Sequence, residues 1–175
     1  MASTLITGGR IITADADFIG DVYIVGEAIA AVGTDLQKTY KADTVIDAKG
    51  KSVFPGGIDP HTHFDMPFGG TSSADDFESG TIAAAFGGTT TVIDFAIQNK
   101  GDSTLKGLET WHKKADGKAT IDYAFHMIVT DMPEERLPEM ERLATEGVTS
   151  YKLFMAYPGV FYVDDGTLYR AFRQA

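Results

Sequence analysis

The stretch that decides the fold runs from residue 89 to residue 129 and reads TTTVIDFAIQNKGDSTLKGLETWHKKADGKATIDYAFHMIV. It predicts a strand over 89–95, an amphipathic helix over 103–115 and a second strand over 121–129. Further strand-then-helix units are expected on both sides of this one. Such a succession calls for a parallel sheet with right-handed crossovers, either a barrel or a doubly wound sheet.

The remaining elements after residue 52 follow the same pattern. Ser73 and Asp76 fit a capping box, and Pro138 is expected to kink the helix that contains it. The expected elements are a helix from just after Ser73 to Gly87–Gly88, a helix over 133–146, a strand over 148–155, and a helix from Asp165 that is still running at Ala175.

The first 52 residues have a different character, rich in glycine and β-branched residues. They predict strands over 4–7 and 10–13 joined by a turn at Gly8–Gly9, a hairpin of 21–25 and 28–32, and a strand over 44–48. A (β/α)₈ barrel needs about 250 residues. The predicted class is therefore α/β: a small β-sandwich module over 1–52, then the first half of a TIM-like barrel over 53–175, cut off within its last helix.

The amino-acid composition restricts the classes of binding partner that the chain can have. The chain has 15 Lys+Arg against 25 Asp+Glu, a formal charge of −10, so neither nucleic acid nor an anionic membrane attracts it electrostatically. It has no cysteine, which excludes disulfides and thiolate ligands and favours a cytoplasmic location. No apolar run approaches the roughly 20 residues of a membrane span. We expect a small-molecule partner.

The segment with the clearest chemistry is Pro55-Gly56-Gly57-Ile58-Asp59-Pro60-His61-Thr62-His63. Because side chains alternate along an extended segment, His61 and His63 point to the same side and can bind one metal ion. Barrels of this kind place their active sites at the carboxyl ends of their strands. A metal site built on this pair is the first functional hypothesis.

Two separated motifs resemble one family. The segment just quoted is similar to the first-strand metal motif of the cyclic amidohydrolases, and its continuation His63-Phe64-Asp65-Met66-Pro67-Phe68-Gly69-Gly70-Thr71 resembles the dihydropyrimidinase and D-hydantoinase branch. The later stretch Ser150-Tyr151-Lys152-Leu153-Phe154-Met155-Ala156-Tyr157-Pro158-Gly159 resembles the same branch. The likeness extends over essentially the whole chain, which corresponds to the N-terminal portion of such proteins.

The resemblance implies a reaction. Lys152 would become carboxylated and bridge two divalent metal ions, most commonly Zn²⁺, which His61 and His63 also bind; an unmodified ammonium would be repelled there. A hydroxide held between the metals would open a dihydropyrimidine or hydantoin ring to an N-carbamoyl amino acid. Tyr157 would donate its hydroxyl to the developing oxyanion. The substrate pocket would be shaped by Met66, Phe68, Phe154 and Tyr157.

Other readings stay open. Allantoinases and dihydroorotases share the His-x-His motif, and non-catalytic dihydropyrimidinase-related scaffold proteins share the fold. His112 and His126 match no family ligand position, and His126 within its strand fits a satisfied core or rim histidine. Asp94, at the end of its strand, fits a cap of the following turn. All three are left out of the expected site. The family also needs two more His ligands and a catalytic Asp that are not located before Ala175, so we expect this polypeptide alone to be inactive. Family members usually form homotetramers.

Overall fold

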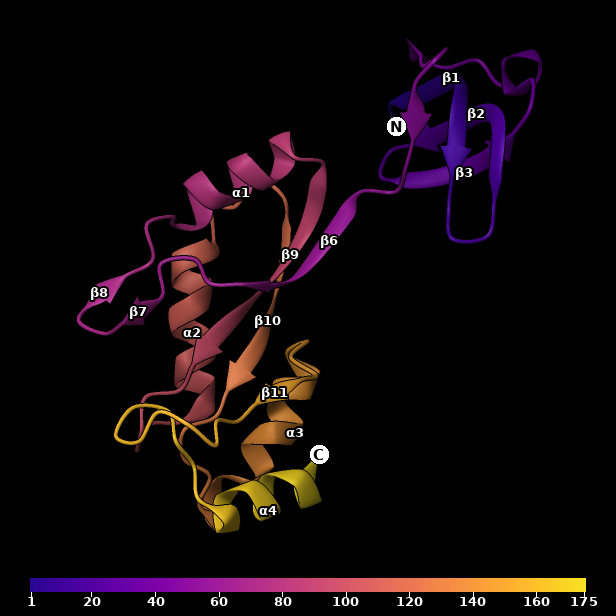
Figure 1. Ribbon diagram of the computed structural model, residues 1–175. Helices are drawn as coiled ribbons and strands as arrows, with labels where there is room; N and C mark the ends of the chain where they lie inside the picture. Colours follow the sequence, from indigo (N-terminus) through magenta and orange to yellow (C-terminus); the bar gives the residue numbers. More distant parts are fainter. The chain divides into compact units, whose positions relative to one another are not determined.

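The computed structural model describes all 175 residues, and the chain divides into two compact units, Met1–Pro55 and Gly56–Ala175 (Figure 1). The boundary expected from the sequence lay slightly earlier, after residue 52. Ser52 and Val53 belong with the first unit because they pair in parallel with Arg10 and Ile11. No helix in the structure has both the length and the apolar composition that crossing a membrane requires.

The first unit is one five-stranded sheet. Its order is β3-β2-β1-β4, with β5 also paired to β1. The elements are β1 (Ser3–Ile12), β2 (Asp17–Val25), β3 (Ala28–Gly33), the short 3₁₀ helix η1 (Leu36–Lys38), β4 (Thr44–Asp47) and β5 (Ser52–Val53). The expected hairpin is confirmed as β2 and β3, which turn at Gly26 with a φ of 59°.

One expectation in this unit was wrong. Residues 4–7 and 10–13 do not form two strands around a turn, because β1 runs continuously through Gly8–Gly9. The pairing of β1 with β2 shifts register between Ile6 and Gly9, and Gly8 has a φ of 68°. The Gly8 N–H donates to the carboxylate of Asp21 at 2.8 Å. The glycine pair therefore makes a β-bulge, where the backbone needs positive φ without reversing direction.

The second unit is built on a four-stranded parallel sheet in the order β11-β10-β9-β6. Its elements are β6 (Gly57–Thr62), β7 (Pro67–Phe68), β8 (Thr71–Ser72), α1 (Phe77–Phe86), β9 (Thr89–Ile97), α2 (Thr104–Ala115), β10 (Asp122–Ile128), η2 (Glu134–Arg136), α3 (Pro138–Thr145), β11 (Tyr151–Lys152) and α4 (Asp165–Gln174). Each strand of this sheet pairs with the next strand of the same sheet along the chain, as consecutive strands commonly do. The α/β class predicted from residues 89–129 is confirmed.

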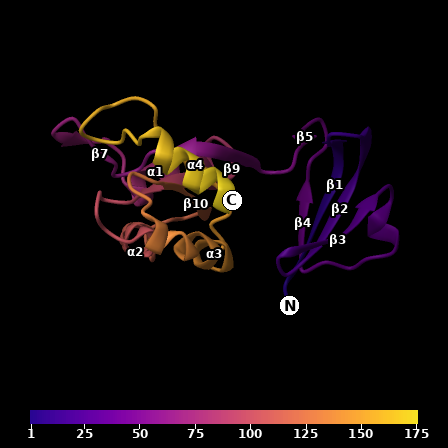
Figure 2. The same cartoon turned by 90° about the horizontal axis from the view of Figure 1, so that it is seen from below.

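Helices α1 and α2 pack on one face of this sheet. Trp111 of α2 is 3% exposed, and Phe125 of β10 contacts both Phe77 of α1 and His112 of α2. Figure 2 shows α2 and α3 side by side, and Glu139 of α3 joins them by accepting hydrogen bonds from the N-terminus of α2. Because side chains alternate along a strand, the residues next to Phe125 in sequence face away from these helices.

Two helix starts differ from expectation. The first helix begins at Phe77, not after Ser73, and its cap is Asp76, whose carboxylate accepts from the N–H of Ser79 at 2.9 Å. Ser73 instead accepts from the N–H of Met66 at 2.8 Å and closes the β7–β8 hairpin. The helix expected over 133–146 is split into η2 and α3. Pro138 does not kink a helix but begins α3, since proline has no N–H to lose there.

The last strand is shorter than expected. The sequence predicted a strand over 148–155, but only Tyr151 and Lys152 form β11, and Phe154 makes an isolated bridge with Tyr162. The apolar run is therefore mostly loop. The final helix ends at Gln174, one residue before the last.

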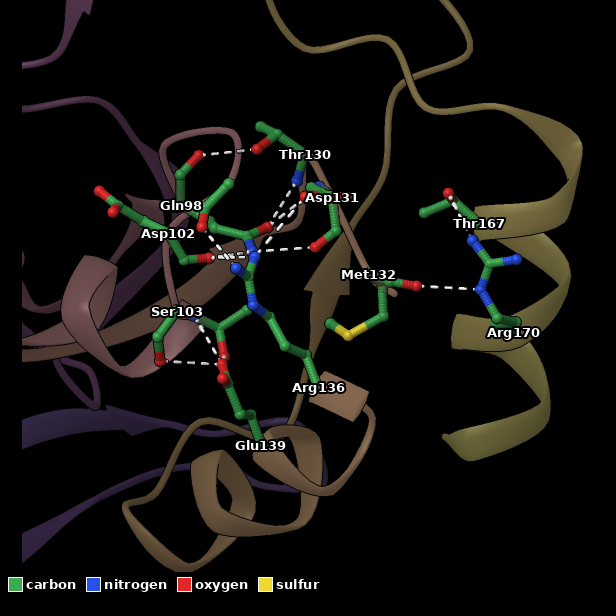
Figure 3. A network of polar contacts seen from close by, with 12 residues as sticks. Gln98, Asp102, Ser103, Thr130, Asp131, Met132, Arg136, Glu139, Thr167 and Arg170 are labelled. Atoms are coloured by element: carbon green, nitrogen blue, oxygen red, sulfur yellow. Dashed lines mark hydrogen bonds and ion pairs between the residues drawn. The ribbon is translucent and has the colours of Figure 1, made fainter. Parts of the chain in front are cut away.

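Polar groups lock the loops that follow β9 and β10 (Figure 3). Gln98, completely buried, accepts from the N–H of Thr130 at 2.9 Å and donates to the carbonyl of Asp131 at 2.9 Å. Glu139 accepts from Ser103 Oγ at 2.9 Å and from Thr104 Oγ1 at 2.6 Å. Both networks lie just beyond the carboxyl ends of their strands. They join the loops at the carboxyl-end edge of the sheet, which is the edge where the expected site lies.

Candidate metal centre

The structure brings the three expected metal-binding side chains together around one aromatic ring. The His61 and His63 ring centroids are 5.1 Å apart and lie 4.6 Å and 5.0 Å from the Phe95 centroid. The Nζ of Lys152 is 4.3 Å from the same centroid. Lys152 comes 89 residues after His63 in the chain. The parallel order of β6, β9, β10 and β11 is what makes it a neighbour of the two histidines.

Strand alternation explains the face on which they meet. Asp94 accepts a hydrogen bond from Trp111 Nε1 at 3.0 Å, so its side chain points toward α2. Phe95, the next residue, points to the other face, away from the helices. His61 and Lys152 lie at the carboxyl ends of β6 and β11, and His63 follows directly. The three side chains therefore meet on the face of the sheet opposite α1 and α2, at the strand ends where barrel enzymes keep their active sites.

Their electrostatics suit metal binding. His63 has a buried Nδ1 atom without any hydrogen-bond partner. Burial lowers the pKa of His63, Asp94 opposes this shift, and Lys152 and His61 add to it. Burial also lowers the pKa of Lys152, which favours the neutral amine. Neutral imidazole is the form that binds metals, and neutral amine is the form that adds CO₂.

The ligand set within this chain is incomplete. No group of three or more His, Cys, Asp or Glu side chains is arranged to hold a metal ion. His61, His63 and Lys152 are suitable ligands, but they supply only part of a metal site. A structural zinc site needs four ligands, and a two-metal site needs more.

Asp94 holds the histidine segment in place. It is completely buried, and one of its oxygens accepts from Thr62 Oγ1 at 3.0 Å and from the Phe64 N–H at 2.7 Å. These two groups are the immediate neighbours of His63 on either side. The other oxygen accepts from Trp111 Nε1 and, at 2.7 Å, from the N–H of Phe95. Four donors satisfy a carboxylate whose burial would otherwise be very costly.

Three of the four expected pocket residues gather in one aromatic cluster. The Tyr157 ring centroid is 5.6 Å from that of Phe154 and 5.7 Å from that of Phe68. Phe154 also lies beside the candidate centre, since Lys152 Nζ is 4.9 Å from its centroid. Tyr157 is 49% exposed and has a φ of 60°, an uncommon conformation for a residue with a side chain. The fourth, Met66, packs against the hydrophobic core of the unit.

An open hollow of about 830 Å³ adjoins the candidate centre. Its lining includes His61, Phe95, His126 and Lys152, and it extends along α4. None of the four expected pocket residues lines it. The hollow is therefore bounded by the strand ends of the candidate centre and by α4, and the aromatic cluster lies outside its lining.

Comparison with known proteins gives this geometry a family. The sequence pattern of the amidohydrolase family matches residues 52–161, more than half of the chain and all of the candidate centre. The chain belongs to the amidohydrolase family. It is 57% identical to a D-hydantoinase of Streptomyces coelicolor over 98% of this chain, and 45% identical to a dihydropyrimidinase of Rattus norvegicus over 97% of it.

Solved structures agree with the fold of this amidohydrolase. The crystal structure of a dihydropyrimidinase from Brevibacillus agri superposes with a TM-score of 0.93 at 49% identity and covers 98% of this chain. The chain spans 38% of the length of the Streptomyces relative and 37% of the Brevibacillus structure. The α/β fold and the family are therefore shown for the described part.

Sequence reasoning left two residues of this amidohydrolase's centre aside. The sequence alone favours a turn cap for Asp94, although a carboxylate inside the apolar run of residues 92–97 needs hydrogen-bond donors on the helix face. The sequence alone favours a satisfied histidine at His126, and the structure places its ring centroid 4.7 Å from that of Phe95, within the centre. The alternation of side chains along a strand could have identified both residues. It places Asp94 on the face toward the helices and His126 on the same face as Phe95.

Proposed function

We propose that this chain forms part of the active site of a metal-dependent hydrolase that opens cyclic amides, dihydropyrimidines or hydantoins, to N-carbamoyl amino acids. The observation that carries the proposal is the meeting of His61, His63 and Lys152 around Phe95, at the strand ends of an amidohydrolase. Water would be added across the ring C–N bond, with hydroxide going to the carbonyl carbon and a proton to the nitrogen.

We assign the residues as follows. His61 and His63 would hold divalent metal ions through neutral imidazoles, and a carboxylated Lys152 would bridge two of them. When bound, such ions, most commonly Zn²⁺, make water nucleophilic near neutral pH and polarise a carbonyl. Tyr157 would donate its hydroxyl to the oxyanion, and its exposure leaves that hydroxyl free to meet a substrate.

The aromatic cluster of Phe68, Phe154 and Tyr157 would contact the ring substituent, with Met66 behind it. Its position beside Lys152 supports this role, because Phe154 contacts both Lys152 and Tyr157.

The architecture follows the same proposal. The four parallel strands in chain order would be the first four of a (β/α)₈ barrel that begins with the second unit at Gly56. The sheet of the first unit would be one layer of a small β-sandwich, which accords with its exposed Ile29, Val32, Val45 and Ile46. We expect a cytoplasmic homotetramer acting on a small molecule.

The test begins with the coding frame beyond Ala175, where two His and one Asp are expected at later strand ends. The protein encoded by the complete reading frame is then incubated with dihydrouracil and hydantoin, with and without chelator. We expect ring opening that chelator abolishes, and no turnover by the 175-residue chain alone. A metal-loaded protein that opens neither ring would refute the proposal.

Other outcomes point to the alternatives. Turnover of only allantoin or dihydroorotate in the same assay would show one of the neighbouring cyclic amidohydrolases instead. A protein without stoichiometric zinc would indicate a non-catalytic scaffold.

A further inference from the structure

His126 makes two polar contacts that join separate parts of the candidate centre. It lies in β10, on the same face as Phe95, with the two rings 36° from parallel. Its Nε2 is 2.9 Å from the carbonyl oxygen of Pro60. Its Nδ1 is hydrogen-bonded to Ser150 Oγ. One side chain thus reaches both a residue of β6 and a residue just before β11.

The partners determine which nitrogen carries the proton. A carbonyl oxygen can only accept, so Nε2 of His126 donates to Pro60. In the neutral ring Nδ1 then accepts, and the hydroxyl of Ser150 donates to it. The two contacts together hold the ring as the Nε2–H tautomer. Both nitrogens of His126 are therefore used in contacts to the protein, which makes it unsuitable as a metal ligand.

The two partners adjoin the proposed ligands. Pro60 directly precedes His61, and Ser150 is two residues before Lys152. Strand β6 is not adjacent to β10, because β9 lies between them. Neighbouring strands are about 4.8 Å apart, so β6 and β10 would be about 10 Å apart in a flat sheet. The curl of the sheet is what allows His126 to reach Pro60.

The strand that carries Lys152 is short, and its backbone bonds to β10 include Met127 N–H to the carbonyl of Ser150 and Val129 N–H to that of Lys152, both at 3.0 Å. Strand β11 has only two residues, paired as Met127 with Tyr151 and Ile128 with Lys152. So short a strand has few ladder hydrogen bonds to set its position. The Ser150–His126 contact adds a side-chain anchor at its start.

We infer that His126 is a positioning residue that sets the separation between the His61/His63 pair and Lys152. This inference rests on the proposed function. Metal sites tolerate errors of only about 0.2 Å in ligand distances, and loss of an outer-shell partner typically costs about 10- to 100-fold in metal affinity. The bridge supplies such a constraint from β10 without contributing a ligand.

The test measures zinc affinity by chelator competition in the protein encoded by the complete reading frame. His126→Phe keeps the ring on Phe95 and removes both polar atoms, so we expect zinc affinity to fall by about 10- to 100-fold. His126→Gln can keep a donor toward Pro60, and His126→Asn can keep an acceptor toward Ser150. Both should lose less affinity than His126→Phe. His112→Phe, the same exchange on α2, should bind zinc like the wild type.

Two further readouts separate positioning from mere stability. The Co²⁺-loaded His126→Phe protein should show a changed visible absorption band, which a loss of stability alone would not produce. Urea unfolding is measured alongside, and a lower midpoint with unchanged zinc affinity would overturn the inference.

If His126→Phe does not fold, the Ser150→Ala and His126→Asn variants decide the question, and wild-type zinc affinity in both would also overturn the inference. A wild-type protein that binds no zinc would instead refute the proposed function.

Discussion

The buried carboxylate of Asp94 is the most consequential single group around the candidate centre. Its two oxygens accept four hydrogen bonds, from Thr62, Phe64, Phe95 and Trp111. Asp94→Asn keeps the shape of the side chain but replaces one acceptor oxygen by an NH₂ group. In either orientation of the amide, two donors then face a donor. The substitution tests whether the carboxylate, not the volume of the side chain, holds the His63 segment.

The expected magnitude follows from the bonds lost. A hydrogen bond to a charged acceptor contributes about 1.5–3 kcal/mol, so two of them amount to about 3–6 kcal/mol. Typical domains have a free energy of unfolding of about 5–15 kcal/mol. We therefore expect Asp94→Asn to lose a large part of the stability of the second unit. Zinc affinity should fall as well, because Thr62 and Phe64 flank His63.

Urea unfolding followed by circular dichroism measures this effect. Emission from Trp111, the only tryptophan in this chain, reports on the same spot because its indole donates to Asp94. The matched control is Asp122→Asn at the exposed start of β10, which should change the unfolding free energy by no more than about 0.5 kcal/mol. If Asp94→Asn stays within about 1 kcal/mol of the wild type, the four-donor account is wrong.

Three further predictions concern the proposed site and its support. Lys152→Ala should lower zinc affinity by at least about 100-fold, measured by chelator competition, and abolish the mass increment of a carbamate. Tyr157→Phe should lower kcat about 100- to 1,000-fold with little change in KM, and an unchanged kcat would remove Tyr157 from the mechanism. Burial raises the pKa of Glu139, but hydrogen bonds from Thr104 and Ser103 and the charge of Arg136 outweigh it and lower the pKa. Its stabilisation is therefore present above the unfolded-state pKa of about 4.3 and is lost as pH falls through the lower folded value. Glu139→Gln should reduce this acid-range slope in urea titrations, and an unchanged slope would contradict the assignment.

Local chemistry made much of the second unit predictable. The alternation of apolar strands and amphipathic helices predicted β9, α2 and β10, because each element is specified by its own periodicity and caps. The His61-x-His63 spacing predicted two imidazoles on one side, and their ring centroids are 5.1 Å apart. The motif around Lys152 predicted that this side chain lies near the two histidines, and Lys152, His61 and His63 all lie beside the ring of Phe95.

Other features depended on competition between local signals. Ser73 and Asp76 are both residue types that cap helices. In the structure the hydroxyl of Ser73 instead accepts from the N–H of Met66 in the β7–β8 hairpin. The glycine pair at residues 8–9 is compatible with a turn or with a β-bulge. The structure forms the bulge, in which the Gly8 N–H donates to the carboxylate of Asp21. The run over 148–155 is apolar enough for a strand, yet only Tyr151 and Lys152 find pairing partners.

The amino-acid sequence by itself determined the class of the fold, the family and the residue types of the proposed centre, since these are written in short stretches with their own periodicity. Only the tertiary structure decided what supports that centre. Asp94 and His126 are ordinary strand residues in sequence. Asp94 accepts hydrogen bonds from Thr62 and Phe64, which lie 32 and 30 residues earlier in the chain. His126 bonds to Pro60, which lies 66 residues earlier. Such contacts exist because a curled parallel sheet brings distant strand ends together, and local sequence does not encode the curl.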